Sequence, residues 1–407
     1  MNLPAAVQNY KIREIHLYSG ITISSFLYAC FIVSNQFYYR VGSILFAAIF
    51  LLTLGLFILE RRKTFFKPNG VQARIWFFLF TFLTIIPLAY SIHGNLKDLL
   101  TLSFHPYAFL AFFISIMALT VHPGTQKELL GFARIVNTLL PFAIIADLVI
   151  LKQPAGINEL HFFLFVELLL FEQLKTGRKL YISILTLVLI VIQILFDNRM
   201  VAIRLLVVSF GLLTFLLIPF LKNRVLRFTV LSGSIVFIYL LSFHFEGTFQ
   251  FFTTYLEKLS IDTTDTRTFL YTEFFDDFKG LQWLGGKGYM GSYFSQWFYE
   301  WQGDDGDHFQ RFSIEIGALE ILLKGGLFLL IPFYALMIGC LYLGFVQAPV
   351  RSMAFRFAFF LLVQFIITGI ENRPAFTINY LLIWLSMGII LVETRYKPKQ
   401  QEHVGHL

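Results

Sequence analysis

Two arginines stand at the start of an apolar run, where charged side chains are rare. Arg199 and Arg204 open the run 201–221. At about 1.5 Å of rise per residue, Arg204 lies ~7 Å deeper along a helix than Arg199. An arginine inside a span costs about 2.5–3.5 kcal/mol on insertion scales and usually faces a cavity or a partner. Snorkelling to the membrane surface accounts equally well for Arg199, but it accounts less well for Arg204.

Acidic residues and a histidine stand close to the same end of the neighbouring apolar runs. Asp147, Glu159 and His161 flank the short segment 152–158. Guanidinium groups keep their charge and match the geometry of phosphate oxygens. The combination predicts a site for an anionic, phosphate-bearing lipid headgroup.

Residues 245–311 differ in composition from the rest of the chain. They hold 11 of the 25 acidic residues against five basic ones, together with Trp283, Trp297 and Trp301. The spacing of apolar residues predicts a short amphipathic helix over 267–278. A flexible turn is expected at Gly285, Gly286, Gly288 and Gly291; it is not a P-loop, because glycine follows Lys287. The aromatic residues suit either an interfacial belt or a platform for sugar rings.

The elements that must position these residues are membrane helices. Hydrophobic residues make up 57% of the 407 residues and charged residues only 14%, against roughly 25% charged in soluble domains. The apolar runs are 18–36, 41–60, 75–92, 106–121, 132–151, 159–174, 180–196, 201–221, 228–244, 313–345, 355–371 and 376–394. Most approach the ~20 residues that cross a bilayer as a helix. Run 159–174 fits a span or a re-entrant segment.

The distribution of Lys and Arg gives an expected orientation. With the N-terminus in the cytoplasm, the inside segments hold 20 basic residues. The short outside loops hold five: Arg40, Lys97, Lys152, Arg199 and Arg373. This bias follows the positive-inside rule, so the net charge of +7 reports topology and gives no evidence for nucleic-acid binding. We therefore predict an all-α polytopic membrane protein of about twelve helices, with spans 1–9 in 1–244, a periplasmic loop in 245–312, and spans 10–12 with a cytoplasmic tail in 313–407.

In pattern, residues 155–345 resemble the bacterial O-antigen polymerases and O-antigen ligases. That superfamily has about twelve spans and a large periplasmic loop between the ninth and tenth, in a GT-C-like arrangement. It has a Ser-Arg-type motif where a span begins on the periplasmic side, and Asn198-Arg199 stands there. Its loop arginine, Gly-x-Gly turn and polar entry to the next helix would be Arg267, 286–288 and 315–326. The ligase branch usually shows His-Asn where this chain has Glu315, and His308 lies seven residues earlier.

The resemblance implies transfer of a glycan from a polyprenyl-pyrophosphate carrier to an acceptor hydroxyl at the periplasmic face. Fixed arginines stabilise a leaving pyrophosphate without a metal or cofactor, and a histidine or carboxylate can accept the proton of the acceptor hydroxyl. The expected pyrophosphate-binding residues are Arg199, Arg204, Arg267 and Arg311. The expected bases are His308, then Glu315, then Asp305 or Asp307.

Each of these residues also has a plain structural interpretation. Arg267 and Arg311 suit ordinary loop charges paired with acids, and His308 suits a solvated surface histidine. The cluster 304–307 could bind a divalent cation, although it lacks the ligand spacing of an EF-hand. Glu320 and Lys324 stand one helical turn apart and are expected to pair with each other.

The acceptor would be a second lipid-linked repeat unit in a polymerase, or lipid A-core in a ligase. The missing His-Asn pair favours the polymerase. A flippase for the same lipid-linked sugars is the alternative from another class, but the large loop and the outer position of the charges favour an enzyme. The expected location is the bacterial inner membrane with both termini in the cytoplasm. A chain-length regulator protein is a further expected partner.

Overall fold

The computed structural model describes residues 71–91, 125–152, 155–196, 198–217, 219–243, 268–296, 310–371 and 377–396. It also describes the separate positions 18–20, 22–23, 48–49, 52, 55, 116, 118–119, 121 and 374. These parts are mostly helical. Three helices are long and apolar enough to cross a membrane: Thr125–Ile150, Thr176–Leu195 and Gly317–Gln347. Shorter apolar helices cover Ala73–Ala89, Val201–Gly211, Met353–Thr368 and Ile378–Thr394. The expectation of an all-α protein with membrane-type helices is confirmed at this level.

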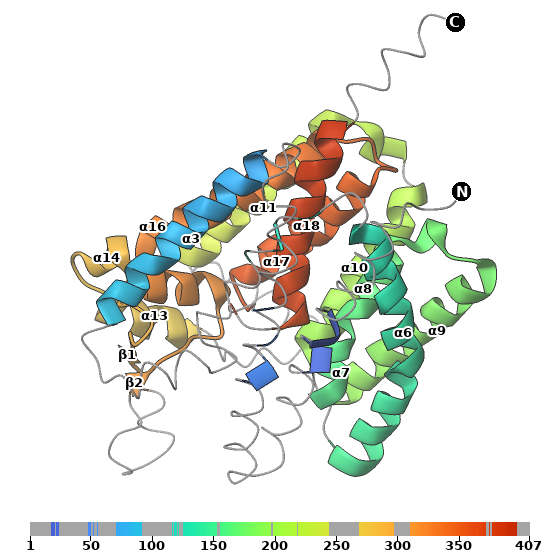
Figure 1. Ribbon diagram of the computed structural model, residues 1–407, viewed down its shortest axis with the longest axis horizontal. Helices are drawn as coiled ribbons and strands as arrows, with labels where there is room; N and C mark the ends of the chain where they lie inside the picture. The colour runs from blue at the N-terminus through green and yellow to red at the C-terminus, as the bar shows by residue number, and fades with distance from the viewer. Residues whose placement is uncertain are drawn as a thin grey trace, which may run out of the picture.

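The bundle has two groups of helices with a pair between them (Figure 1). On one side α3 (Val71–Ser91) packs along α16 (Gly317–Leu341), which continues into the π-helix η6 (Tyr342–Gln347). On the other side lie α6 (Thr125–Ala146), η3 (Asp147–Leu151), α7 (Ala155–Leu160), α8 (Phe162–Leu169), η4 (Phe171–Gln173) and α9 (Thr176–Leu195). The central pair is α17 (Met353–Thr368) and α18 (Ile378–Tyr396). Helix α10 (Arg199–Leu217) contacts α8, α9 and α17; η5 (Pro219–Lys222) and α11 (Arg224–Phe243) follow it.

Burial follows the apolar pattern of each helix. Helix α17 is apolar nearly all round, and almost every residue in it is buried, as expected for a helix enclosed by others. Helix α9 instead exposes one stripe at helical spacing: Leu180, Ile184, Leu187, Val191 and Leu195 are 53–75% exposed. An exposed stripe of this kind suits contact with lipid chains.

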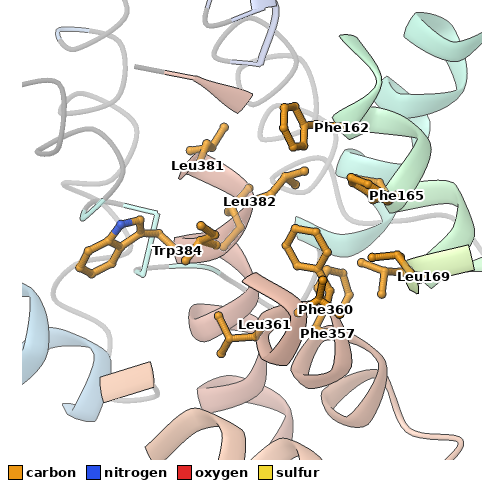
Figure 2. Close-up of a cluster of buried hydrophobic side chains, with 14 of the residues drawn as sticks. Phe162, Phe165, Leu169, Phe357, Phe360, Leu361, Leu381, Leu382 and Trp384 are labelled. Carbon is orange, nitrogen blue, oxygen red and sulfur yellow. The ribbon is translucent and has the colours of Figure 1, made fainter. Parts of the chain in front are cut away.

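The centre of the bundle is an aromatic and leucine-rich contact between α8, α17 and α18 (Figure 2). Phe165 of α8 meets Phe360 of α17 at a ring-centroid distance of 5.7 Å. On the α3 side, Trp384 of α18 meets Phe80 edge-on at 5.1 Å. Because lipid is as apolar as these side chains, close packing is what holds such helices together.

Residues 155–173 cross the bundle instead of turning back within it. At one end, the Ile157 amide donates to Asp147 Oδ2 at 2.7 Å, just past the end of α6. At the other end, Glu167 pairs with Arg178 at the start of α9, with Nη2 and Oε1 2.6 Å apart. The segment therefore runs antiparallel to both α6 and α9. These contacts favour a span over a re-entrant segment for this run.

Candidate functional site

The described part of the large loop folds against the first half of α16. Helix α13 (Thr268–Asp277), helix α14 (Gln282–Gly285) and the antiparallel strands β1 (Tyr293–Phe294) and β2 (Gln310–Arg311) surround that half. The predicted amphipathic helix is confirmed, because Leu270, Phe274 and Phe278 are all buried. They form a second hydrophobic core with Leu319 and Leu323 of α16. Burying apolar area in this way attaches the loop to a membrane helix.

The backbone of the predicted glycine turn packs closely against the backbone of α16. Gly286 has φ +73°, and a Cβ there would lie 2.6 Å from the Gly325 nitrogen. Gly326, inside α16, has φ +60°, and its Cβ would lie 2.3 Å from the Leu284 carbonyl oxygen. Only glycine allows two backbones to approach so closely. The Lys287 amide then donates to the Leu323 carbonyl at 2.6 Å.

Lys324 and Glu320 attach the loop to α16 through hydrogen bonds to backbone groups. The expected pairing between the two side chains did not predict this role. Lys324 is buried, and its Nζ donates to the carbonyl oxygens of Tyr289 at 3.1 Å, Gly291 at 2.9 Å and Phe312 at 2.5 Å. Glu320 Oε2 accepts from the Ile314 amide at 2.8 Å. A buried charge is tolerated when its hydrogen bonds are satisfied in this way.

Arg311 and Glu315 form an ion pair just before the N-terminal end of α16. Arg311 Nη2 lies 2.7 Å from Glu315 Oε1, and Nη1 donates to the Tyr293 hydroxyl at 3.2 Å. Burial raises the pKa of the Tyr293 hydroxyl above its usual value, and the oxygen of that hydroxyl accepts the arginine hydrogen bond. The Glu315 side chain remains 38% exposed, so solvent reaches its carboxylate.

Arg204 lies buried in α10, with its side chain only 3% exposed. Its Nη2 is 3.5 Å from Oε2 of Glu371, and its guanidinium lies 5.3 Å from the centroid of the Phe162 ring. Glu371 belongs to the connection between α17 and α18. Burial of an arginine beside a carboxylate and an aromatic face follows the general rule that buried charges have partners.

Glu371 also links the two arginine pairs. Its carbonyl oxygen accepts from the amide of Gly317 at 2.9 Å, and Gly317 stands two residues after Glu315. Arg204 and Arg311 therefore lie at the same end of the bundle, near the start of α16. We call Arg204, Glu371, Arg311 and Glu315 the arginine–carboxylate cluster.

A buried histidine, His161, lies at the junction of α7 and α8, beside this cluster. His161 is fully buried, and its Nδ1 lies 3.2 Å from the Ile157 carbonyl oxygen. Its Nε2 has no hydrogen-bond partner among the residues that the structure describes. Next to it, Asn158 Oδ1 accepts from Gln193 and from Asn198, each at 3.0 Å. Asn198 thus positions the first turn of α10, the helix that carries Arg204.

The structure describes only some of the predicted site residues. It brings Arg204, Arg311 and Glu315 to one end of the bundle, as the cluster shows. Arg199 is the first residue of α10, and its side chain is not described. Arg267, Asp305, Asp307 and His308 lie outside the described residues, so their roles stay predictions.

Sequence reasoning missed Glu371 as a site residue. Its signal is an acidic residue that ends an apolar run, directly before Asn372 and Arg373 in a short connection. Asp147, by contrast, was expected to serve the headgroup site. It is buried, and its carboxylate accepts the Ile157 amide, which gives it a structural role at the start of the α7–α8 segment.

Within the described residues, no group of three or more His, Cys, Asp or Glu side chains could hold a metal ion. No protein-family model, curated protein or solved structure matches the chain. The chemistry of the arginine–carboxylate cluster is therefore the basis for assigning a function.

Proposed function

We propose that this protein is a glycan polymerase of the bacterial inner membrane, acting on polyprenyl-pyrophosphate-linked oligosaccharide at the periplasmic face. The observation that carries the proposal is the arginine–carboxylate cluster at one end of an apolar helical bundle. Two arginines from distant parts of the chain lie at that end, each beside one carboxylate. Guanidinium groups exchange a carboxylate for a phosphate readily, because both present paired oxygens.

The position of the cluster supports a substrate anchored in lipid. Arg204 is buried in the apolar helix α10, whereas Arg311 belongs to the loop. A pyrophosphate that joins a lipid tail to a sugar would need positive charge at the membrane surface, and the sugar would need a groove above that surface. The opposite end of the described helices carries most of their basic residues, which favours a periplasmic position for the cluster under the positive-inside rule.

The reaction that fits these groups is a single displacement. The acceptor hydroxyl oxygen attacks the anomeric carbon, and the bond from that carbon to the pyrophosphate oxygen breaks. Arg204 and Arg311 stabilise the charge on the departing pyrophosphate. Glu315, or the predicted base His308, accepts the proton of the hydroxyl. Attack opposite to the leaving group would invert the anomeric centre.

Deletion of the gene, followed by gel analysis of the surface glycan, tests the proposal. Single-repeat glycan without a ladder supports the polymerase. Complete loss of glycan from lipid A, with lipid-linked polymer accumulating, would mean a ligase instead. Failure to deliver lipid-linked units to the outer leaflet would mean a transporter and would overturn the enzyme assignment.

A residue-level test uses the two arginines that the structure describes. In complemented cells, Arg204→Gln and Arg311→Gln should each lower polymer formation by about 100-fold or more, the usual effect of removing one charge-stabilising donor. Arg134→Gln is the matched control, because Arg134 is exposed at the far end of the bundle. Full activity in both variants, at wild-type protein levels, would refute a pyrophosphate clamp at this cluster.

A further inference from the structure

A cavity lies in the half of the bundle away from the arginine–carboxylate cluster. It has a volume of about 240 Å³ and is enclosed by α8, α9, α10 and the start of α17. Thr186, Ile190, Leu206, Ser209 and Phe355 form its lining, which is mostly apolar. A water molecule occupies roughly 30 Å³ of liquid, so the cavity is large enough for several methylene groups of a lipid chain.

The cavity opens toward lipid between α9 and α10. Leu187 and Phe210 stand at its edge, and they are 64% and 69% exposed on the outer faces of these helices. Ser209 lies five residues beyond Arg204 on α10, or ~7.5 Å deeper at the rise of an α-helix. A hydrocarbon chain can therefore enter from the bilayer without passing the arginine–carboxylate cluster.

An ion pair between a buried arginine and an exposed glutamate lies at the far end of this cavity. Arg356 is buried, and its guanidinium pairs with Glu172 while Nη1 donates to the Leu169 carbonyl oxygen at 3.2 Å. Both side chains contribute to the lining. The cavity thus runs from apolar walls to a charged end, which is the polarity of a lipid molecule.

Basic residues are frequent in the segments that contain or follow the lining residues of that charged end. The segments 167–179, 219–228 and 350–356 hold two acidic residues, Glu167 and Glu172, each paired with an arginine. The same segments hold eight basic residues: Lys175, Arg178, Lys179, Lys222, Arg224, Arg227, Arg351 and Arg356. Lys179 Nζ lies 5.6 Å from the ring centroid of Phe171, a lining residue, and exposed Arg351 follows the lining residue Val350. Basic pockets between membrane helices are typical sites for anionic lipid headgroups.

We propose that this cavity binds one anionic phospholipid, with an acyl chain between α9 and α10 and the phosphate headgroup on Lys179 and Arg351. The basic residues near the charged end favour a phospholipid as the occupant over the hydrocarbon tail of a lipid-linked sugar. The phosphate groups of a sugar carrier would belong at Arg204, at the opposite end of the bundle.

The test uses the purified full chain in a neutral detergent. Phosphatidylglycerol or phosphatidylcholine with identical acyl chains is added, and native mass spectrometry counts the lipid that the protein retains. The expected result is one retained phosphatidylglycerol and no equivalent retention of phosphatidylcholine. Arg351→Gln should weaken retention by about fivefold, since one basic residue near a lipid surface has an effect of that order.

A second variant fills the cavity itself. Ser209 Oγ has no hydrogen-bond partner among the described residues, so Ser209→Leu removes no such contact while occupying the space for the chain. It should abolish the retained lipid. Lys152→Gln, at the opposite end of the bundle, and Thr229→Leu, on the exposed face of α11, are matched controls that should leave retention unchanged.

Equal retention of the two lipids, or unchanged retention in both Arg351→Gln and Ser209→Leu, would overturn the proposal. Displacement of phosphatidylglycerol by a polyprenyl phosphate at equal concentration would also overturn it. That outcome would identify the occupant as the carrier chain.

Discussion

The contact between the glycine turn and α16 gives a prediction whose magnitude can be worked out. Gly286 has φ 73° and ψ −169°, a region that essentially only glycine populates, so another residue costs about 1–3 kcal/mol there. The Cβ of Gly286→Ala would also lie 2.6 Å from backbone atoms of Lys324 and Gly325. Overpacking against a fixed neighbour costs about 1–3 kcal/mol more. The free energy that attaches the turn to α16 should therefore fall by about 4 kcal/mol.

Gly280→Ala is the matched control in the same loop. Gly280 also has a positive φ, +56°, but nothing lies within 4 Å of the position that its Cβ would take. Only the left-handed conformation is penalised there, at about 1–2 kcal/mol. The two variants differ by about 2.5 kcal/mol, which corresponds to about 60-fold in an opening equilibrium.

Hydrogen exchange of the Lys287 amide measures this opening directly. That amide donates to the Leu323 carbonyl, so it exchanges when the turn leaves α16. Exchange should be about 60-fold faster in Gly286→Ala than in Gly280→Ala. Equal exchange rates in the two variants would refute the conclusion that the turn is held by close backbone contact.

Two further predictions concern the loop and the predicted clamp. Lys324→Met leaves the carbonyl oxygens of Tyr289, Gly291 and Phe312 without their donor, so it should destabilise the protein by about 3 kcal/mol or more; an unfolding midpoint equal to that of the wild type would contradict this. Arg199→Ala and Arg267→Ala should each abolish polymer formation while the protein level holds, as judged by glycan gels and immunoblots of membranes. If both variants remain active, neither side chain belongs to the pyrophosphate site.

Much of the secondary structure follows from local apolar patterns. The run predicted over 180–196 corresponds to α9, and the run 355–371 corresponds to α17, because such stretches satisfy their backbone hydrogen bonds in lipid only as helices. The helix predicted over 267–278 is found as α13, because its buried residues repeat at helical spacing. The position of Arg204 within the apolar run 201–221 also indicated a charged side chain well inside the helix.

Only the tertiary structure decided which charged groups meet. Arg204 and Glu371 are 167 residues apart, and their pairing depends on how α10 packs against the end of α17. The sequence shows four glycines over 285–291, but the close contact of Gly286 with Gly325 and Gly326 requires the two backbones to be placed side by side. Likewise, the three acceptors of Lys324 are carbonyl groups, which carry no side-chain signal. Local periodicity therefore determined the helices, whereas long-range packing determined the arginine–carboxylate cluster and the cavity that we assign to a lipid.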